Sequence, residues 1–297
     1  VWCYGDDFLR LRFFMKKQAL IISALALGVL SGCVSQQAND TADFYDTAEN
    51  SGLTKRVAAA DYVLLGEKHD NPQHHIIQEK ILKNTLNAGD VVVFEMINSD
   101  QQPVMDQYLS GALPHDELEE ALNWSKSGWP DWTFYAPLFE AAKNAKAIIK
   151  YGSFPRKQLM NMDEDRTVLA DLLSADQLLE LDETIELSHC NMLPDNMVRP
   201  MSLLQIKKDK LLARQMLTRD NTKRAYLVAG NGHIRKDRAV PIHLKADNIF
   251  VLSLAEELSE PDQWDLYSAY DAVWITESLG KTQEDYCKDL EKRFKKS

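Results

Sequence analysis

Five short apolar runs, separated by helix-like segments, constrain the fold of this chain more than any other feature of its sequence. The runs cover residues 62–65, 91–94, 147–149, 225–228 and 249–252. Runs of this kind are typical of buried strands, and strands that alternate with helices form a mainly parallel sheet. The sequence therefore predicts one α/β domain over residues 44–297, in which helices flank the sheet.

Helix boundaries are marked by caps and by periodicity. Asn71 followed by Pro72 is typical of an N-cap and the first residue of a helix, and apolar residues then recur at helical spacing. A long helix is predicted over residues 195–217. Residues 98–134, between the second and third strands, predict a helical lid or insertion, and the Lys- and Glu-rich residues 281–297 predict a solvated C-terminal helix.

The N-terminal part has the pattern of a bacterial lipoprotein signal peptide. Lys16 and Lys17 precede a mostly apolar run over residues 19–30, and small residues then lead directly into Cys33. The apolar run is too short to cross the hydrocarbon core of a bilayer.

This pattern predicts how the chain is processed and where it is placed. We expect residues 1–32, an upstream extension plus the signal peptide, to be removed, and Cys33 to carry the lipid. Residues 33–43 are polar and small and are expected to form a tether. The expected location is the bacterial cell envelope, with the lipid anchor in the outer membrane.

Two further observations bound the function. The formal net charge of −11, with no long basic run outside the extreme termini, excludes a nucleic-acid binder that works by neutralising phosphates. Cys190 and Cys287 remain after processing, in a compartment where disulfides persist. Sequence separation does not decide whether these two cysteines lie within bonding distance, so a disulfide stays one of two alternatives.

Polar side chains follow the predicted strands, and in a parallel sheet ligands bind beyond the carboxyl ends of the strands. Glu67 and His69 follow the first strand, Glu95 follows the second and His233 follows the fourth. Carboxylates and neutral imidazoles bind zinc, manganese or iron and also carry protons near neutral pH. These four residues therefore predict either a metal site or an acid–base site.

Other polar residues lie close to this predicted site in the sequence. His74 and His75 fall in the first turn of the helix that begins at Pro72, where the helix dipole disfavours added positive charge, so we expect them to be neutral and able to ligate. Arg156 and Arg235 concentrate positive charge near the strand ends, which suits an anionic ligand. Exposed loop charges without a partner are the alternative interpretation.

The predicted insertion and its surroundings are rich in aromatic residues. Trp132 and its neighbours predict either the core of the insertion itself or the walls of a site for a flat apolar ligand. Tyr135 and His189 are of the residue types that ligate haem iron.

A set of short motifs runs through most of the chain. The motifs are Leu65–Pro72 with His74-His75, Phe94-Glu95-Met96, Trp132–Tyr135 with Pro137, His189-Cys190 with Leu193-Pro194, and Ala229–Arg235 with Val240-Pro241. In combination, over residues 44–255, they resemble the ChaN-like haem-binding lipoproteins of the Tiki superfamily. The lipoprotein signal pattern agrees with this resemblance.

The resemblance implies an α/β fold with a helical lid, a role in iron-regulated haem uptake, and haem held at or near a homodimer interface with tyrosine ligation. On this basis Tyr135 is the expected iron ligand and His189 the second candidate, with Trp132 and Arg156 also at the haem. The expected partners are haem, a second copy of the chain, and the membrane through the lipid anchor.

The wider superfamily also includes metal-dependent peptidases and esterase-like enzymes. The alternative prediction is therefore a hydrolase in which Glu67, His69, Glu95 and His233 hold a divalent metal that polarises water.

Overall fold

The computed structural model describes residues 51–160, 171–256 and 269–294. Within these residues a six-stranded sheet has the order β3-β2-β4-β1-β5-β6, and every neighbouring pair is parallel. The strands are β1 (Tyr62–Glu67), β2 (Val91–Asn98), β3 (Ile148–Ser153), β4 (Ala225–Gly230), β5 (Ile249–Glu256) and β6 (Ala272–Thr276). The predicted α/β class with a mainly parallel sheet is confirmed.

All five predicted strands are present, and each continues beyond its apolar run, in four of them into polar residues. β1 ends at Glu67, β2 includes Glu95 and β5 ends at Glu256. An apolar run therefore marks the first part of a strand, and the strand continues to a carboxyl end that still pairs within the sheet. The sequence analysis missed β6, a five-residue edge strand that pairs only with β5 among the described strands.

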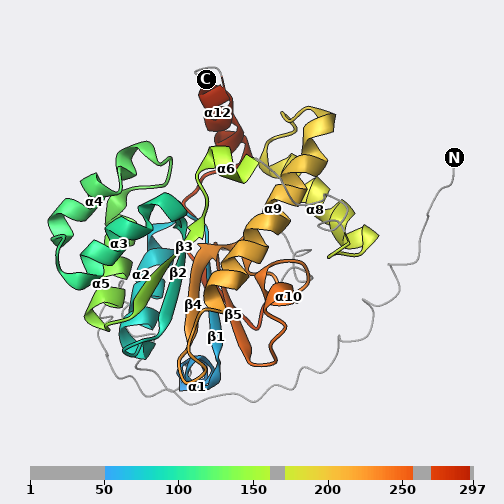
Figure 1. The fold of residues 1–297 in the computed structure, drawn as a ribbon. Coiled ribbons are helices and arrows are strands. Elements are labelled where there is room, and N and C mark those ends of the chain that lie inside the picture. The colour runs from blue at the N-terminus through green and yellow to red at the C-terminus, as the bar shows by residue number, and fades with distance from the viewer. Residues whose placement is uncertain (1–50, 161–170, 257–268, 295–297) are drawn as a thin grey trace, which may run out of the picture. The chain divides into compact units, whose positions relative to one another are not determined.

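Helices cover both faces of the sheet (Figure 1). One face packs against α1 (Ser51–Ala59), α2 (Pro72–Thr85), α3 (Gln102–Ser110) and α5 (Trp132–Asn144). The other face packs against α9 (Asp195–Met216) and α10 (Val240–Leu244), and α8 (Ala175–Ser188) packs on α9. Alternation along β1 explains both layers, because Val63 and Leu65 belong to the first core and Leu64 to the second.

The insertion between β2 and β3 is helical, as predicted. It contains α3, α4 (Leu118–Ala121) and three short 3-10 turns. Met105, Tyr108 and Trp124 from this region belong to the same core as α2 and α5. The insertion therefore extends one helical layer and shares its core with the sheet.

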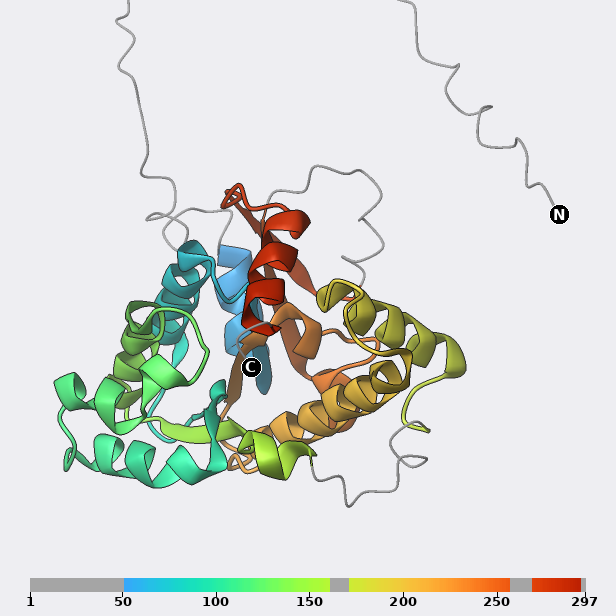
Figure 2. The ribbon, with the colours of Figure 1, turned by 90° about the horizontal axis from the view of Figure 1, so that it is seen from above.

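Two elements lie at the carboxyl end of the sheet. α6 (Arg156–Met160) follows β3, and α12 (Gln283–Phe294) follows β6; Figure 2, seen from above, shows α12 over the strand ends. Cys190, just after α8, forms a disulfide with Cys287 in α12, with a Cα–Cα distance of 5.6 Å. The sequence left open whether these two cysteines form a disulfide, and the structure contains that disulfide.

The predicted signal peptide and extension (1–32), the lipidated Cys33 and the tether (33–43) lie outside the described residues. Among the residues that are described, no helix has the length and apolar character needed to cross a membrane.

Candidate functional site

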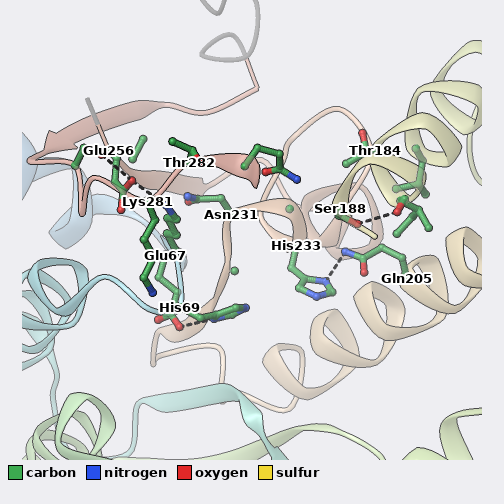
Figure 3. Close-up of a pocket in the computed structure, with 18 of the residues that line it drawn as sticks. Glu67, His69, Thr184, Ser188, Gln205, Asn231, His233, Glu256, Lys281 and Thr282 are labelled. Atoms are coloured by element: carbon green, nitrogen blue, oxygen red, sulfur yellow. Dashed lines mark hydrogen bonds and ion pairs between the residues drawn. The ribbon is translucent and has the colours of Figure 1, made fainter. Parts of the chain in front are cut away.

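The predicted strand-end residues meet at one pocket of about 1040 Å³. Glu67, His69 and His233 line it, and Figure 3 shows both imidazoles beside the same space. Thr184 and Ser188 of α8 form one side of the pocket, and the segment before α12, including Lys281, forms another. These three predicted residues therefore lie at one pocket.

Glu67 is buried at the end of β1 and accepts two hydrogen bonds on Oε1. His69 Nδ1 and the Tyr135 hydroxyl each donate to this oxygen at 2.7 Å. Burial raises the pKa of the Glu67 carboxyl, but His75, His69 and the two hydrogen bonds outweigh burial, so the net pKa lies below its ordinary value. Glu67 is therefore ionised at neutral pH.

His75 lies beside the second carboxylate oxygen of Glu67. Its Nε2 donates to the carbonyl oxygen of His69 at 2.9 Å, because a carbonyl can only accept. Its Nδ1 lies 3.6 Å from Glu67 Oε2, and both atoms are buried without a hydrogen-bond partner among the described residues.

Glu95 is the second buried carboxylate of the site. Lys208 Nζ donates to its Oε1 at 2.5 Å and the Gly230 N–H donates to its Oε2 at 2.8 Å. His233 Nε2 lies 3.3 Å from Oε1. Burial raises the pKa of Glu95, but Lys208 and His233 outweigh it and hold the pKa well below its ordinary value.

His233 connects Glu95 to a third buried acid, Asp209 of α9. His233 Nδ1 donates to Asp209 Oδ1 at 2.5 Å. Burial lowers the pKa of His233, but Glu95 and Asp209 outweigh burial and raise it to about 9. Burial raises the pKa of Asp209 to about 6, although His233 opposes this. At neutral pH the pair is an imidazolium and a carboxylate.

The sequence analysis missed Lys208 and Asp209, which complete this network from α9. A signal was present in the sequence. Asp209 lies three residues from both Ile206 and Leu212, on the helix face that carries the apolar stripe. A charged residue on such a face is buried, and a buried charge needs a partner.

His69 is the imidazole of the site that reaches the open part of the pocket. Its side chain is 35% exposed, while that of His233 is 8% exposed. Its Nδ1 is bound to Glu67, so its Nε2 faces away from that carboxylate and lies 3.9 Å from Glu95 Oε2. The ring of Trp129, from the loop before α5, meets the His69 ring edge-on with centroids 4.9 Å apart.

Gly230 leaves room for this imidazole. A Cβ at position 230 would lie 2.9 Å from His69 Nε2 and 3.1 Å from its Cε1. A glycine is required here because of this close approach to the His69 ring.

Two predicted ligands lie behind the pocket. Tyr135 is fully buried, and burial beside the Glu67 carboxylate raises the pKa of its phenol far above its ordinary value. His74 is also buried: its Nδ1 accepts from the Lys68 N–H at 2.9 Å and its Nε2 donates to Thr276 Oγ1 at 2.9 Å. Burial lowers the pKa of His74 to about 4, so it is neutral as predicted, but both nitrogens are already bonded. These positions argue against either residue as a ligand in the pocket.

The remaining predicted residues do not meet at the pocket. Trp132 stacks on Phe139 inside the helical layer, with centroids 5.6 Å apart. His189 caps α8, where its Nδ1 donates to the Ile185 carbonyl at 2.7 Å. These two side chains form local structure, which is the commoner role of an aromatic residue at helical spacing and of a histidine at a helix end.

Two arginines were predicted near the site, and the structure describes the side chain of one of them, Arg235. Arg235 is buried and forms ion pairs with Asp237 at 2.5 Å and Glu180 at 3.4 Å, so its charge is directed to these acids. The side chain of Arg156 lies outside the described residues. Arg238, which follows His233 in the sequence and adds to the same basic group, lines the pocket.

The described residues contain no group of three or more His, Cys, Asp or Glu side chains arranged to hold a metal ion. The four residues of the predicted metal set do lie near one another, but each is bonded within the network. Glu67 binds His69, and Glu95 binds Lys208, while His233 binds Asp209.

Comparison with known proteins gives one family match. A family model described as haem-binding uptake, Tiki superfamily, ChaN matches residues 53–244. No curated protein matches the chain.

Three solved structures are similar to the chain. ChaN of Campylobacter jejuni, solved as a structure of cofacial heme binding, is 24% identical with a TM-score of 0.56, and the match covers 71% of this chain and 87% of that one. The type III effector HopBA1 is 12% identical with a TM-score of 0.40, covering 76% and 92%. The MARTX toxin effector domain RRSP of Vibrio vulnificus CMCP6 is 15% identical with a TM-score of 0.35, covering 69% and 39%. The first shares the fold, and the other two carry no functional argument.

Proposed function

This chain belongs to the haem-binding uptake family of the Tiki superfamily, ChaN, and on that premise we propose that it binds haem in the pocket at the carboxyl end of the sheet. The observation that carries the proposal is the presentation of His69 in this pocket. The pocket has a volume of about 1040 Å³. This volume is at the upper end of the range of ordinary ligand pockets, about 300–1,000 Å³. The position beyond the strand ends is where open parallel sheets bind ligands.

We propose His69 as the iron ligand, in place of Tyr135. Imidazole is a common haem ligand, and a ligating histidine usually donates its other N–H to a carboxylate, which fixes the ring and raises its basicity. The His69–Glu67 hydrogen bond of 2.7 Å supports this assignment. No tyrosine is among the described residues that line the pocket, and Tyr135 acts through Glu67, as a positioning residue.

Basic residues around the pocket suit the two propionates of haem. Lys68, Arg238 and Lys281 line it. Lys68 now pairs with Glu256 at 2.8 Å and Lys281 with Asp70 at 2.9 Å. A bound propionate would displace Asp70 from Lys281 at little cost, because both side chains of this ion pair are partly exposed.

The test is a titration of the protein with ferric haem, followed by absorbance. We expect saturable binding, which His69→Ala abolishes or weakens by about tenfold or more, equivalent to roughly 1.4 kcal/mol. His189→Ala is the matched control, because this histidine caps α8 away from the pocket, and it should leave the spectrum unchanged. Loss of the signal in His189→Ala with full binding in His69→Ala would overturn the assignment.

We also propose that the protein acts in haem acquisition as an outer-membrane lipoprotein, anchored at Cys33, and that haem is held at a homodimer interface. The signal pattern before Cys33 supports the anchor. The disulfide between Cys190 and Cys287 suits the oxidising conditions of the cell envelope. The cofacial haem of the Campylobacter jejuni protein suggests two facing sites, and sedimentation of the apo and haem-loaded protein tests for a dimer.

A second candidate function is hydrolysis by acid–base chemistry, which the Glu67–His69 pair favours. A histidine that is oriented by a buried carboxylate and open to a pocket can take a proton from water. Burial lowers the pKa of His69, but Glu67 and Glu95 outweigh it and raise the pKa, so the fraction of neutral, basic imidazole grows as the pH rises. Ester and peptide hydrolysis that rises with pH and is lost in His69→Ala would support this function. Absence of turnover across such a panel would reject it.

A further inference from the structure

The pocket has two walls that come from distant parts of the chain and that one disulfide joins. α8 contributes Thr184, Ile185 and Ser188, and the segment before α12 contributes Lys281 and Thr282. Figure 3 shows Thr184 and Ser188 on the α8 side and Thr282 facing the same space. Cys190 follows α8 by two residues and bonds to Cys287 of α12, across a sequence separation of 97.

Within the part of the chain that the structure describes, α12 lies against its surroundings through partly exposed polar side chains. None of residues 281–292 is buried, so the helix has no side chain in a core over this range. Its contacts with the β1 end include the Lys281–Asp70 ion pair and the Tyr286 hydroxyl, which donates to Asp70 Oδ2 at 2.9 Å. The Lys68 ammonium also lies 4.7 Å from the centre of the Tyr286 ring. Partly exposed polar contacts of this kind contribute little to stability.

On the α8 side, among the described residues, Gln283 adds weak contacts beside the disulfide. Gln283 Nε2 donates to the Leu187 carbonyl at 3.3 Å and lies 4.0 Å from Cys190 Sγ and 3.8 Å from Cys287 Sγ. Both cysteines are half-buried, so a reductant in solution can approach them.

We infer that the Cys190–Cys287 disulfide is a redox-sensitive clasp that fixes the α12 wall of the pocket and so controls ligand exchange. In the oxidised protein both walls are joined and exchange is slow. A dithiol reductant donates two electrons and two protons: its own sulfurs form a disulfide, the Cys190–Cys287 bond breaks, and each cysteine becomes a thiol. α12 then keeps its non-covalent contacts but loses its covalent bond to the α8 side, and the pocket opens between α8 and Lys281.

The inference rests on the proposed function only for the nature of the ligand, so its first test uses no ligand. Hydrogen exchange of the amides in residues 283–292 is measured on the full chain, oxidised and reduced by a phosphine. We expect exchange in α12 to rise by about tenfold or more on reduction, while β1 and β4 stay unchanged. The double variant Cys190→Ser, Cys287→Ser should exchange like the reduced protein and should not respond to the phosphine. Unchanged exchange in α12 would overturn the clasp.

The second test measures ligand exchange with gallium protoporphyrin, whose metal the phosphine does not reduce. Dissociation of the porphyrin should be faster in the reduced protein and in the double serine variant than in the oxidised protein. Equal rates in all three would overturn control of exchange by the disulfide. If no form of the protein binds the porphyrin, the proposed haem site fails, while hydrogen exchange still decides whether the disulfide holds α12.

Discussion

Glu95 receives hydrogen bonds from two elements, α9 through Lys208 and β4 through the Gly230 N–H. A buried carboxylate is costly unless it is paired and hydrogen-bonded. Here Lys208 and His233 supply positive charge, and Asp209 in turn balances His233. At the scale of residues the site is therefore a charge network in which each buried group depends on its neighbours, and His69 is the member that reaches the pocket.

Gly230→Ala tests the position of His69 without removing it. A Cβ at this position would lie 2.9 Å from His69 Nε2 and must displace the ring. We expect haem affinity to fall by about tenfold or more in a haem titration. Gly52→Ala is the control, because a Cβ there meets no atom within 4 Å. Unchanged affinity in Gly230→Ala would place the haem iron away from His69.

His233 predicts a pH dependence of stability. Its pKa is raised from an ordinary 6.5 to about 9, so the folded state binds this proton more tightly than the unfolded state does. The stabilisation is complete below pH 6.5 and is lost as the pH rises to about 9, with a free energy of at most about 3 kcal/mol. Urea unfolding across this range should show falling stability. In His233→Gln the slope should flatten, and a slope that persists would belong to other groups.

At the scale of elements, each strand end and the helix after it form one structural unit. Asn71 illustrates this: its side-chain oxygen accepts from the Gln73 N–H at 3.0 Å and caps α2, while its Nδ2 donates to Glu256 at the end of β5 at 3.1 Å. One buried side chain thus begins a helix and ties it to a strand that follows it by more than 170 residues. The cap was predicted from sequence, whereas the bond to β5 was not.

Asn71→Ala should therefore cost more than an ordinary cap. The lost cap accounts for about 1 kcal/mol, and the unpaired Glu256 oxygen adds to it, so we expect a loss of about 1–3 kcal/mol in chemical unfolding. Ser174→Ala removes an exposed cap at α8 and serves as the matched comparison. Equal losses in both variants would mean that the bond to Glu256 contributes nothing.

At the scale of the whole molecule, the residues that line the pocket extend beyond the residues that the family model matches. The family match ends at residue 244, yet β5, β6 and α12 follow it. β5 pairs with β1 and completes the sheet, and the segment before α12 forms a wall of the pocket. The residues that the family model matches therefore contain the buried charge network. The residues after position 244 contribute a wall of the pocket through which a ligand would reach this network.

The proposed anchor is also a property of the whole molecule. Cys33→Ser should move the expressed protein from the membrane fraction to the aqueous fraction, because the acyl chains that the cysteine would carry are lost. Fractionation followed by detergent partition measures this change. Ser35→Ala, two residues further along, is the control and should stay with the membrane. Retention of Cys33→Ser in the membrane fraction would contradict lipidation at this residue.

The sequence by itself determined the α/β class, five of the strands, the α2 cap and the strand-end positions of Glu67, His69, Glu95 and His233. These features follow from local periodicity, from capping chemistry and from the rule that parallel strands end at one edge. Side chains that share a buried face recur about every two residues in a strand and about every four residues in a helix. This short spacing can be recognised in a single sequence.

Only the tertiary structure decided which side chains share the pocket. Tyr135 and His74 have the chemistry of ligands, but packing of α2 and α5 against the sheet buries them behind Glu67 and against Thr276. Lys208 and Asp209 enter from α9, and Cys190 meets Cys287 across 97 residues. Such contacts join segments with no local relation in sequence, and their energies arise only when the folded chain excludes water from between them.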